Sequence, residues 1–348
     1  MYPIKVKAIE WTGKGVKWLN TNLLPHQEVY EESSDYERVA KAIESMEIRG
    51  APAIGVAAAF AVAAAVVNAD INDVSKLRLL AVKAIERLSR TRPTAYNLFW
   101  ALERMRKVVM KEYSNGDELR KAIVNEALKI YNEDIETNIK IGEIGEKLIE
   151  DGDTILTHCN AGALATAAFG TALAVIRVAW YKGKRISVIA TETRPVLQGA
   201  RLTVWELRKE GIPVTLITDN MVGYVMYRKL VNKVIVGADR ILGDGHVINK
   251  IGTYTIAIAA KRHGIPFYVA APTSTFDLRS RIDEVKIEER NPDEVRKVLN
   301  RALITIEDVN VLNPAFDITP PDLVTGIITE KGIVTEPYTE NIKKLFSL

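Results

Sequence analysis

The single cysteine of the chain, Cys159, stands where an apolar run ends and a segment of small residues begins. The run at 153–158 predicts a strand, and the residues after it predict a short turn that opens a helix. Such a turn leaves backbone N–H groups free, and a helix N-terminus lowers the pKa of a thiol held there. A thiol in this place can act as an acid, a base or a nucleophile. A free cysteine is often just a small buried hydrophobe, so the pattern alone leaves both roles open.

A carboxylate candidate, Asp239, follows another apolar run at a comparable point. The run Val-Ile-Val-Gly-Ala precedes it, and its two small residues allow a backbone or a substrate to approach closely. In an open parallel sheet, ligands bind at the carboxyl ends of the strands near the topological switch, so residues directly after strands can meet a substrate. Asp239 could instead cap a helix or pair with Arg240.

Two basic segments are suited to an anion such as phosphate. Arg49 and Gly50 precede Ala51-Pro52, which predicts the first turn of a helix, so free N–H groups and a guanidinium lie together. Arg92 stands before another proline in the same manner. Either segment taken alone is a weak signal, because arginines beside helix starts are common.

Amide and ammonium groups form a further candidate set. Asn249 and Lys250 precede an apolar helical pattern and could bind the same ligand. Gln198 is one of only two glutamines and precedes Gly199 at another predicted helix start, although a solvent-exposed role is its alternative. The four histidines lack the spacing of metal ligands, so no metal site is expected.

The elements that position these groups differ between the two parts of the chain. Residues 3–31 predict a small antiparallel sheet with a hairpin turn at 12–15, and residues 34–150 are periodic as helices are. The expected helix starts carry capping residues at Ser34-Asp35, Asn72-Asp73, Thr94 and Asn115-Gly116-Asp117. The alanine-rich stretch 51–67 is too short to span a bilayer and predicts a buried helix.

From residue 154 onward, strands alternate with helices. The predicted strands are 154–158, 186–191, 214–218, 234–236, 267–271 and 323–328, and the predicted helices are 161–177, 199–210, 221–231 and 252–263. This alternation predicts a parallel sheet covered on both faces. The expected fold is therefore α/β: a Rossmann-like, doubly wound, mostly parallel sheet at 141–348, preceded by a smaller, mainly helical domain at 1–140.

The composition of the 348 residues excludes several classes of protein. One cysteine rules out an internal disulfide framework, and mixed charges with a net charge of +3 give no support for nucleic-acid binding. Neither dinucleotide nor ATP fingerprints occur. The start of the chain does not resemble a secretory signal, so a cytoplasmic location is expected. The scarcity of glutamine beside abundant Ile, Glu, Lys and Arg hints at a hot environment.

Taken together and in order, these segments resemble the methylthioribose-1-phosphate isomerases of methionine salvage from about Trp11 to Pro337. More weakly, they resemble ribose-1,5-bisphosphate isomerases and the regulatory subunits of translation initiation factor 2B, which share the fold. The segments that carry the resemblance are Arg49-Gly-Ala-Pro-Ala-Ile-Gly55, Thr157-His-Cys-Asn-Ala-Gly162, Thr191-Glu-Thr-Arg-Pro195, Gln198-Gly-Ala-Arg201, Thr218-Asp-Asn220, Gly237-Ala-Asp-Arg240 and Asn249-Lys-Ile-Gly252.

The resemblance implies an isomerase of a sugar phosphorylated at C1, with Cys159 and Asp239 as the catalytic residues. It implies that the substrate is bound by Arg49, Gly50, Ala51, Arg92, Gln198, Asn249 and Lys250. It implies no metal or organic cofactor, and it suggests a homodimer. Two alternatives stay open: isomerisation of ribose 1,5-bisphosphate, and a non-enzymatic subunit that binds a translation factor. A proton transfer by Cys159 and a hydride shift also stay open as mechanisms.

Overall fold

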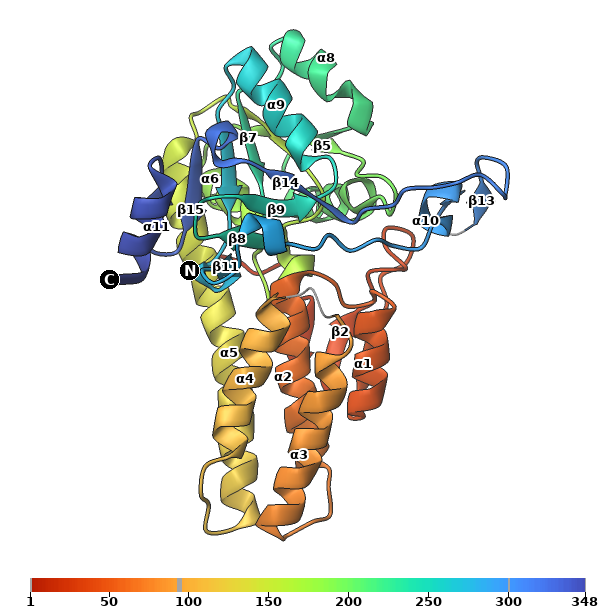
Figure 1. Ribbon diagram of the computed structural model, residues 1–348, viewed down its shortest axis with the longest axis vertical. Coiled ribbons are helices and arrows are strands. Elements are labelled where there is room, and N and C mark those ends of the chain that lie inside the picture. The colour runs from red at the N-terminus through yellow and green to blue at the C-terminus, as the bar shows by residue number, and fades with distance from the viewer. Residues whose placement is uncertain (1, 93–95, 300, 348) are drawn as a thin grey trace. The chain divides into compact units, whose positions relative to one another are not determined.

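The computed structural model describes residues 2–92, 96–299 and 301–347 (Figure 1). Its contacts divide the chain into two compact units: a helical unit of residues 3–138 and 162–170, and a sheet unit of residues 1–2, 139–161 and 171–348. The segment 162–170 packs with the helical unit, which a simple division at residue 140 does not anticipate. Two domains at 1–140 and 141–348 stay a prediction.

The helical unit begins with an antiparallel sheet of β1 (Ile9–Trp11), β2 (Val16–Leu19) and β3 (Tyr30–Ser33). Trp11 pairs with Val16 across the turn, so the predicted hairpin is confirmed. The strand β3 is absent from the prediction because Tyr30-Glu-Glu-Ser33 is mostly polar. Its partner β2 supplies the buried face.

The helices of this unit start at the expected capping residues. Asp35 accepts a hydrogen bond from the N–H of Glu37, and Asp73 accepts one from Lys76. The start expected at Thr94 lies outside the described residues. The helices are α1 (Tyr36–Glu44), α2 (Ala51–Val67), α3 (Val74–Ser89), α4 (Tyr96–Val109) and α5 (Gly116–Gly145), of which the last seven residues belong to the sheet unit.

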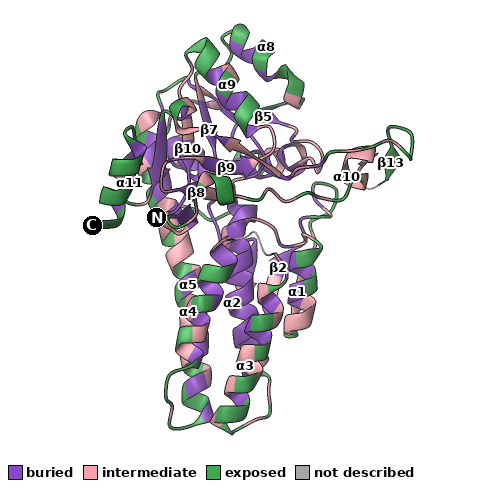
Figure 2. Cartoon of the chain, in the orientation of Figure 1, coloured by how far each residue is buried: buried purple, intermediate pink, exposed green. Residues whose placement is uncertain are grey.

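Helix α2 is the core of the helical unit. Its side chains are buried almost all round because they are small enough to let neighbouring helices approach closely (Figure 2). A Cβ added at Gly55 would lie 2.8 Å from the carbonyl oxygen of Asn97 on α4. Within the described part of the chain, α2 and the other helices all fall short of the length and apolarity that a membrane span requires.

The sheet unit is built on a large sheet in the order β16-β15-β10-β7-β4-β5-β6. All its strands run parallel except β16, which pairs antiparallel with β15 at one edge. The strands are β4 (Thr154–Thr157), β5 (Ser187–Thr191), β6 (Val214–Ile217), β7 (Lys233–Val236), β10 (Phe267–Ala270), β15 (Gly326–Thr329) and β16 (Gly332–Val334). Along the chain, β5 and β6 are added on one side of β4, and β7 is added on the other side. The topological switch therefore lies between β4 and β7.

Both faces of this sheet are covered. Neighbouring residues of one strand enter different hydrophobic cores: Val234 and Val236 lie in one, while Ile235 lies in the other. The first core is closed by α8 (Val222–Tyr227), α9 (Thr253–His263) and α11 (Tyr338–Ser347), and the second by α6 (Ala172–Tyr181) and α7 (Val204–Glu210). The α/β fold expected from the sequence is thus confirmed.

A second sheet, in the order β11-β8-β9-β14, is absent from the prediction. Its strands are β11 (Phe276–Asp277), β8 (Arg240–Leu242), β9 (Val247–Lys250) and β14 (Phe316–Thr319). They are short, and β9 pairs with a strand more than sixty residues away, so no local pattern reveals them. Farther along the chain, α10 (Asp293–Arg296), β12 (Lys297–Val298) and β13 (Ala302–Leu303) form an arm that projects from the sheet unit (Figure 1).

The helix predicted at 161–177 is wrong over its first half. Helix α6 begins only at Ala172, and Phe169 and Gly170 have φ angles of 76° and 81°, which no helix contains. The intervening residues instead pack inside the helical unit, where a Cβ on Gly50 would lie 2.4 Å from the Cα of Ala165. The chain is therefore not α-helical over 162–170, because these residues pack against the helical unit, with Ala165 next to Gly50.

Candidate active site

The two strands at the topological switch end in the two candidate catalytic residues. Cys159 follows β4 by two residues, and Asp239 follows β7 by three. The loops touch, since a Cβ on Gly237 would lie 2.7 Å from that of Ala161. The switch point of the sheet therefore holds a thiol and a carboxylate, as the strand-end argument predicts.

Cys159 is nearly buried and has a left-handed backbone with a φ of 60°. Its N–H donates to the Thr193 hydroxyl at 2.8 Å, and its carbonyl accepts from the Thr203 hydroxyl at 2.6 Å. The expectation that this turn opens a helix is wrong, because α6 starts thirteen residues later. Cys159 therefore does not lie at the N-terminus of α6, and the dipole of that helix does not act on its thiol.

The neighbouring His158 is held in one tautomer. Its Nε2 lies 2.9 Å from the carbonyl oxygen of Ile251, which can only accept, so Nε2 carries the hydrogen. Its Nδ1 then accepts from the Thr191 hydroxyl at 2.6 Å. Burial lowers the pKa of His158, which keeps the ring neutral. Both ring nitrogens are engaged away from the thiol, so Cys159 and His158 do not form a nucleophile–base pair.

The structure does not favour either alternative role of Asp239, as a helix cap or as the partner of Arg240. The next element is the strand β8 rather than a helix, and the guanidinium of Arg240 pairs with Asp277 at 3.6 Å. The N–H of Asp239 donates to the carbonyl of Ile248 at 3.0 Å. This bond places Asp239 beside β9, opposite Ile248, which directly precedes Asn249.

Asn249 and Lys250 are the last two residues of the strand β9, and the helix α9 that was expected after them begins at Thr253. The Asn249 amide donates to the Thr253 hydroxyl at 3.0 Å. The Lys250 ammonium donates to the carbonyl of Ala315 at 3.0 Å and lies 4.8 Å from the ring centre of Phe316. Pairing with β14 thus holds both side chains next to the switch point.

Gln198 is buried, and its Oε1 accepts no hydrogen bond from the described residues. A buried amide oxygen without a partner is costly, so such an atom is suited to a ligand. Gln198 precedes a π-helical turn at Gly199–Thr203, and a Cβ on Gly199 would lie only 1.8 Å from the carbonyl oxygen of Thr191. The glycine therefore lets Gln198 approach the end of β5.

The remaining predicted binding residues belong to the helical unit. Gly50 is the N-cap of α2 with a φ of 90°, and Ala51 opens its first turn, as predicted. Arg49 and Arg92 are half-buried. The helix start predicted at Ala51 is therefore confirmed, and it lies next to Arg49 in the sequence. Cys159, Gln198, Asp239, Asn249 and Lys250 all belong to the sheet unit, where they lie at or after the ends of strands.

Sequence reasoning noted Asp219 after a strand without giving it a role, and it did not single out Asp317; both carboxylates hold the turns that carry these groups. Asp219 accepts from the N–H groups of Thr193 and Arg194, at 2.8 and 2.7 Å. Asp317 accepts from the N–H of Gly252 at 2.7 Å, and burial raises its pKa to about 6. Asp219 stands directly after a strand, which was a usable signal, whereas nothing local distinguishes Asp317.

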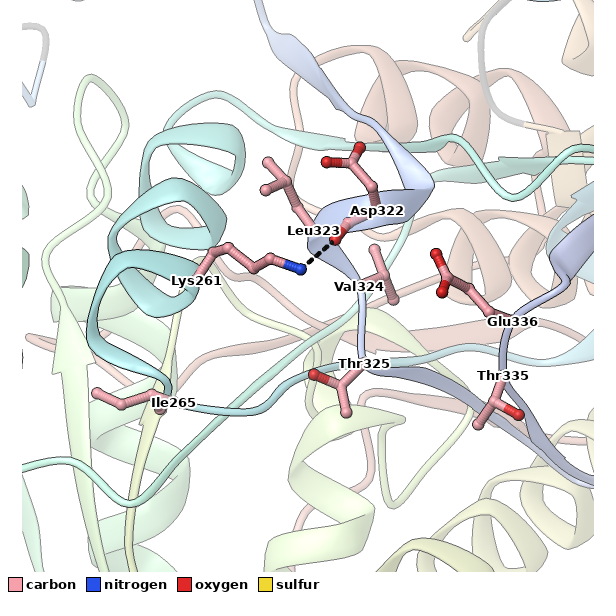
Figure 3. A pocket seen from close by; sticks show the side chains of 8 residues that line it. All are labelled: Lys261, Ile265, Asp322, Leu323, Val324, Thr325, Thr335 and Glu336. Carbon is pink, nitrogen blue, oxygen red and sulfur yellow. Dashed lines mark hydrogen bonds between the residues drawn. The ribbon is translucent and has the colours of Figure 1, made fainter.

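No cluster of three or more possible metal ligands occurs among the described residues. A pocket of about 340 Å³ lies elsewhere in the sheet unit, between α9 and the segments flanking β15 and β16 (Figure 3). Ile265 and Thr325 on its wall precede the parallel strands β10 and β15. The pocket therefore lies at the amino ends of the strands, opposite the candidate active site.

The fold and the strand-end residues define an α/β protein with its candidate site at a Rossmann-like switch point. A family model described as the initiation factor 2 subunit family matches residues 47–336, and the chain belongs to that family.

Its relatives include both enzymes and a translation factor. The methylthioribose-1-phosphate isomerase of Petrotoga mobilis is 54% identical over 99% of this chain and 100% of its own length. A crystal structure of 5-methylthioribose 1-phosphate isomerase from Pyrococcus horikoshii is 44% identical, covers 98% of this chain and 96% of its own, and has a TM-score of 0.92. A crystal structure of the translation initiation factor eIF-2B, subunit delta, from A. fulgidus is 47% identical, covers 99% and 100%, and has a TM-score of 0.90.

Proposed function

We propose that this protein is an aldose-ketose isomerase that converts 5-methylthioribose 1-phosphate to 5-methylthioribulose 1-phosphate, a step of methionine salvage. The observation that carries the proposal is the thiol and the carboxylate at the two strand ends of the switch point. Near full-length similarity to enzymes of that name supports the choice of substrate.

Asp239 acts as the acid that opens the sugar ring. The substrate carries its phosphate at C1, so the ring cannot open as a free hemiacetal would. Asp239 donates a proton to the ring oxygen as the anomeric centre opens, then assists proton movement at O2. Its place beside β9 puts it next to the polar side chains of Asn249 and Lys250.

Cys159 acts in the transfer of hydrogen from C2 to C1. In one route the thiolate takes the C2 proton and returns a proton to C1 through an enediol. In the other, hydride moves directly and Cys159 stabilises the developing charge. Deuterium uptake at C1 during turnover in D2O distinguishes the routes, because only proton exchange introduces solvent deuterium.

The proposed substrate ligands are the seven binding residues expected from the sequence. Arg49, Gly50, Ala51 and Arg92 supply guanidinium and N–H groups suited to the phosphate. In the sheet unit, the buried Oε1 of Gln198, which accepts no hydrogen bond from the described part of the chain, can accept one from a sugar hydroxyl. Asn249 and Lys250 add an amide and an ammonium group.

The test is an NMR assay without coupling enzymes, in which the purified protein meets 5-methylthioribose 1-phosphate and, separately, ribose 1,5-bisphosphate. Appearance of the ketose carbonyl from the first alone supports the proposal. Conversion of the second alone assigns the protein to the bisphosphate reaction. Conversion of neither by the folded protein refutes an isomerase.

A non-enzymatic role is the second candidate, because the eIF-2B delta structure from A. fulgidus covers nearly the whole chain. A regulatory subunit that only binds a partner needs neither a strand-end thiol nor an acid. Co-sedimentation with a translation factor, combined with no turnover, would favour this role.

We also propose a homodimer in the cytoplasm. Support for self-association comes from exposed apolar side chains on or beside β6 and α8, where few such groups are expected on a monomer (Figure 2). They are Leu216, Met221, Tyr224, Tyr227 and Leu230. Sedimentation at several concentrations tests the dimer, and a persistent monomer would contradict it.

A further inference from the structure

Two residues with left-handed backbones are hydrogen-bonded to each other at the candidate active site. Cys159 has a φ of 60° and Thr193 a φ of 63°. This region is rare for any residue other than glycine, and rarer still for a β-branched one. Such strain persists where the surroundings determine the conformation, and it gathers at functional sites.

Both polar groups of the Cys159 backbone are held by threonine hydroxyls. Thr193, after β5, accepts the Cys159 N–H at 2.8 Å, and Thr203, in the π-helical turn, donates to the Cys159 carbonyl at 2.6 Å. Thr193 and Thr203 are themselves fully buried, so water does not compete for these bonds. The two hydroxyls therefore fix the backbone on both sides of the Cys159 Cα, one at the N–H and one at the carbonyl.

A chain of hydrogen bonds fixes the direction of the Thr193 hydroxyl. The Thr191 hydroxyl gives its hydrogen to Nδ1 of His158, so the Thr193 hydroxyl directs its own hydrogen toward Thr191, whose hydroxyl lies at 3.2 Å and whose carbonyl oxygen lies at 3.4 Å. The lone pairs of Thr193 are thereby left to accept from Cys159. Asp219 holds the same turn by accepting from the Thr193 N–H.

We propose that Thr193 and Thr203 are positioning residues, which hold Cys159 in its left-handed conformation and thereby aim its thiol at the substrate. The proposal rests on the proposed function and adds residues that do not touch the reacting atoms. Its physical basis is that Sγ lies only two bonds from the Cα, and the two hydroxyls fix the backbone N–H and carbonyl on either side of that Cα. A displacement of about 1 Å at a reacting group can cost roughly 100-fold in rate.

The first test is Thr193→Val, which keeps the β-branched shape and removes the acceptor. We expect kcat to fall at least roughly tenfold while KM stays within threefold, and Thr193→Ser to restore kcat to within threefold. The matched control is Thr319→Val, because the Thr319 hydroxyl is buried in the same unit without a hydrogen-bond partner among the described residues. Its kcat should equal that of the wild type.

The second readout is independent of turnover. Since Cys159 is the only cysteine, the rate of alkylation by iodoacetamide reports on its thiol alone. We expect Thr193→Val to be alkylated at least threefold faster than the wild type, because the buried thiol gains freedom. Thr193→Ser and Thr319→Val should stay within twofold.

Either of two results overturns the proposal: a kcat of Thr193→Val within threefold of the wild type, or an alkylation rate unchanged by that substitution. If Thr193→Val does not fold, Thr203→Val replaces it under the same criteria. An inactive wild type refutes the proposed function, while the alkylation rates still decide whether the hydroxyls position the thiol.

Discussion

At the residue scale, the proposed chemistry depends on where two strands end. Cys159 and Asp239 are far apart in the sequence, yet they follow the two strands that flank the topological switch. Around them, Gln198, Asn249 and Lys250 supply polar groups from neighbouring strand ends. The separation of reacting groups from binding groups makes distinct predictions for kcat and KM.

Replacing Asp239 by Asn should remove the acid that opens the ring. We expect kcat to fall at least roughly 100-fold with KM within threefold, the size of effect typical of general acid catalysis. The matched control is Asp244→Asn in the turn between β8 and β9, where the side chain is 45% exposed and the carboxylate accepts from the N–H of His246, which an Asn carbonyl can also do. An Asp239→Asn enzyme that turns over as fast as this control would exclude Asp239 as the acid.

Replacing Arg92 by Ala should instead weaken binding of the phosphorylated sugar. We expect KM to rise roughly tenfold or more with kcat changed less, because the guanidinium interacts with the phosphate in the ground state and the transition state alike. Arg90→Ala, at the exposed end of α3, is the control. Equal KM values for the two variants would remove Arg92 from the site.

At the element scale, the sequence predicted what is local and missed what is distant. The alanine-rich composition of α2 and the capping aspartates at 35 and 73 predict those helices from nearby residues alone. The sheet containing β9 and β14 depends on pairing across more than sixty residues, so the support for Lys250 could not be foreseen. The helix expected after Cys159 failed because 162–170 packs with the helical unit. The strand-end residues were found because their position follows from the order of elements.

The π-helical turn at Gly199–Thr203 requires a residue without a Cβ at position 199. A Cβ at Gly199 would lie 1.8 Å from a backbone oxygen of Thr191, so Gly199→Ala must displace the turn. We expect the free energy of unfolding to fall by about 2 kcal/mol or more, measured by urea denaturation.

The matched control is Gly223→Ala in α8, where an added Cβ meets no atom within 4 Å. Alanine is the better helix former, so this change should raise stability by up to about 1 kcal/mol. Equal stability of the two variants would contradict the close approach at Gly199.

At the scale of the whole molecule, stability should depend on pH through groups in both units. His158 has a lowered pKa, so its contribution is present above pH 6.5 and is lost as the pH falls below that value. Asp317 and Asp134 have pKa values raised by burial, to about 6 and about 7. Their contributions have the opposite sign, because the native state keeps these carboxyls protonated: stability is lost as pH rises from about 3.8 through those values.

Asp134→Asn isolates one of these groups. The carboxylate accepts from the N–H of Ala167 and the amide of Asn138, and the Asn carbonyl can accept the same bonds. The stability of the variant relative to the wild type should rise between pH 4 and pH 7, by at most about 1.4 kcal/mol per pH unit, and level off above pH 7. Thermal midpoints measured across this range check it, and a difference independent of pH would contradict the raised pKa.

The turnover of Cys159→Ser on 5-methylthioribose 1-phosphate, followed by NMR beside the wild type, tests the central claim most directly. We predict that kcat falls at least roughly 100-fold while KM stays within threefold, because serine keeps the size of the side chain but not the acidity of the thiol. Turnover close to that of the wild type would remove the thiol from the reaction and contradict the assignment of Cys159.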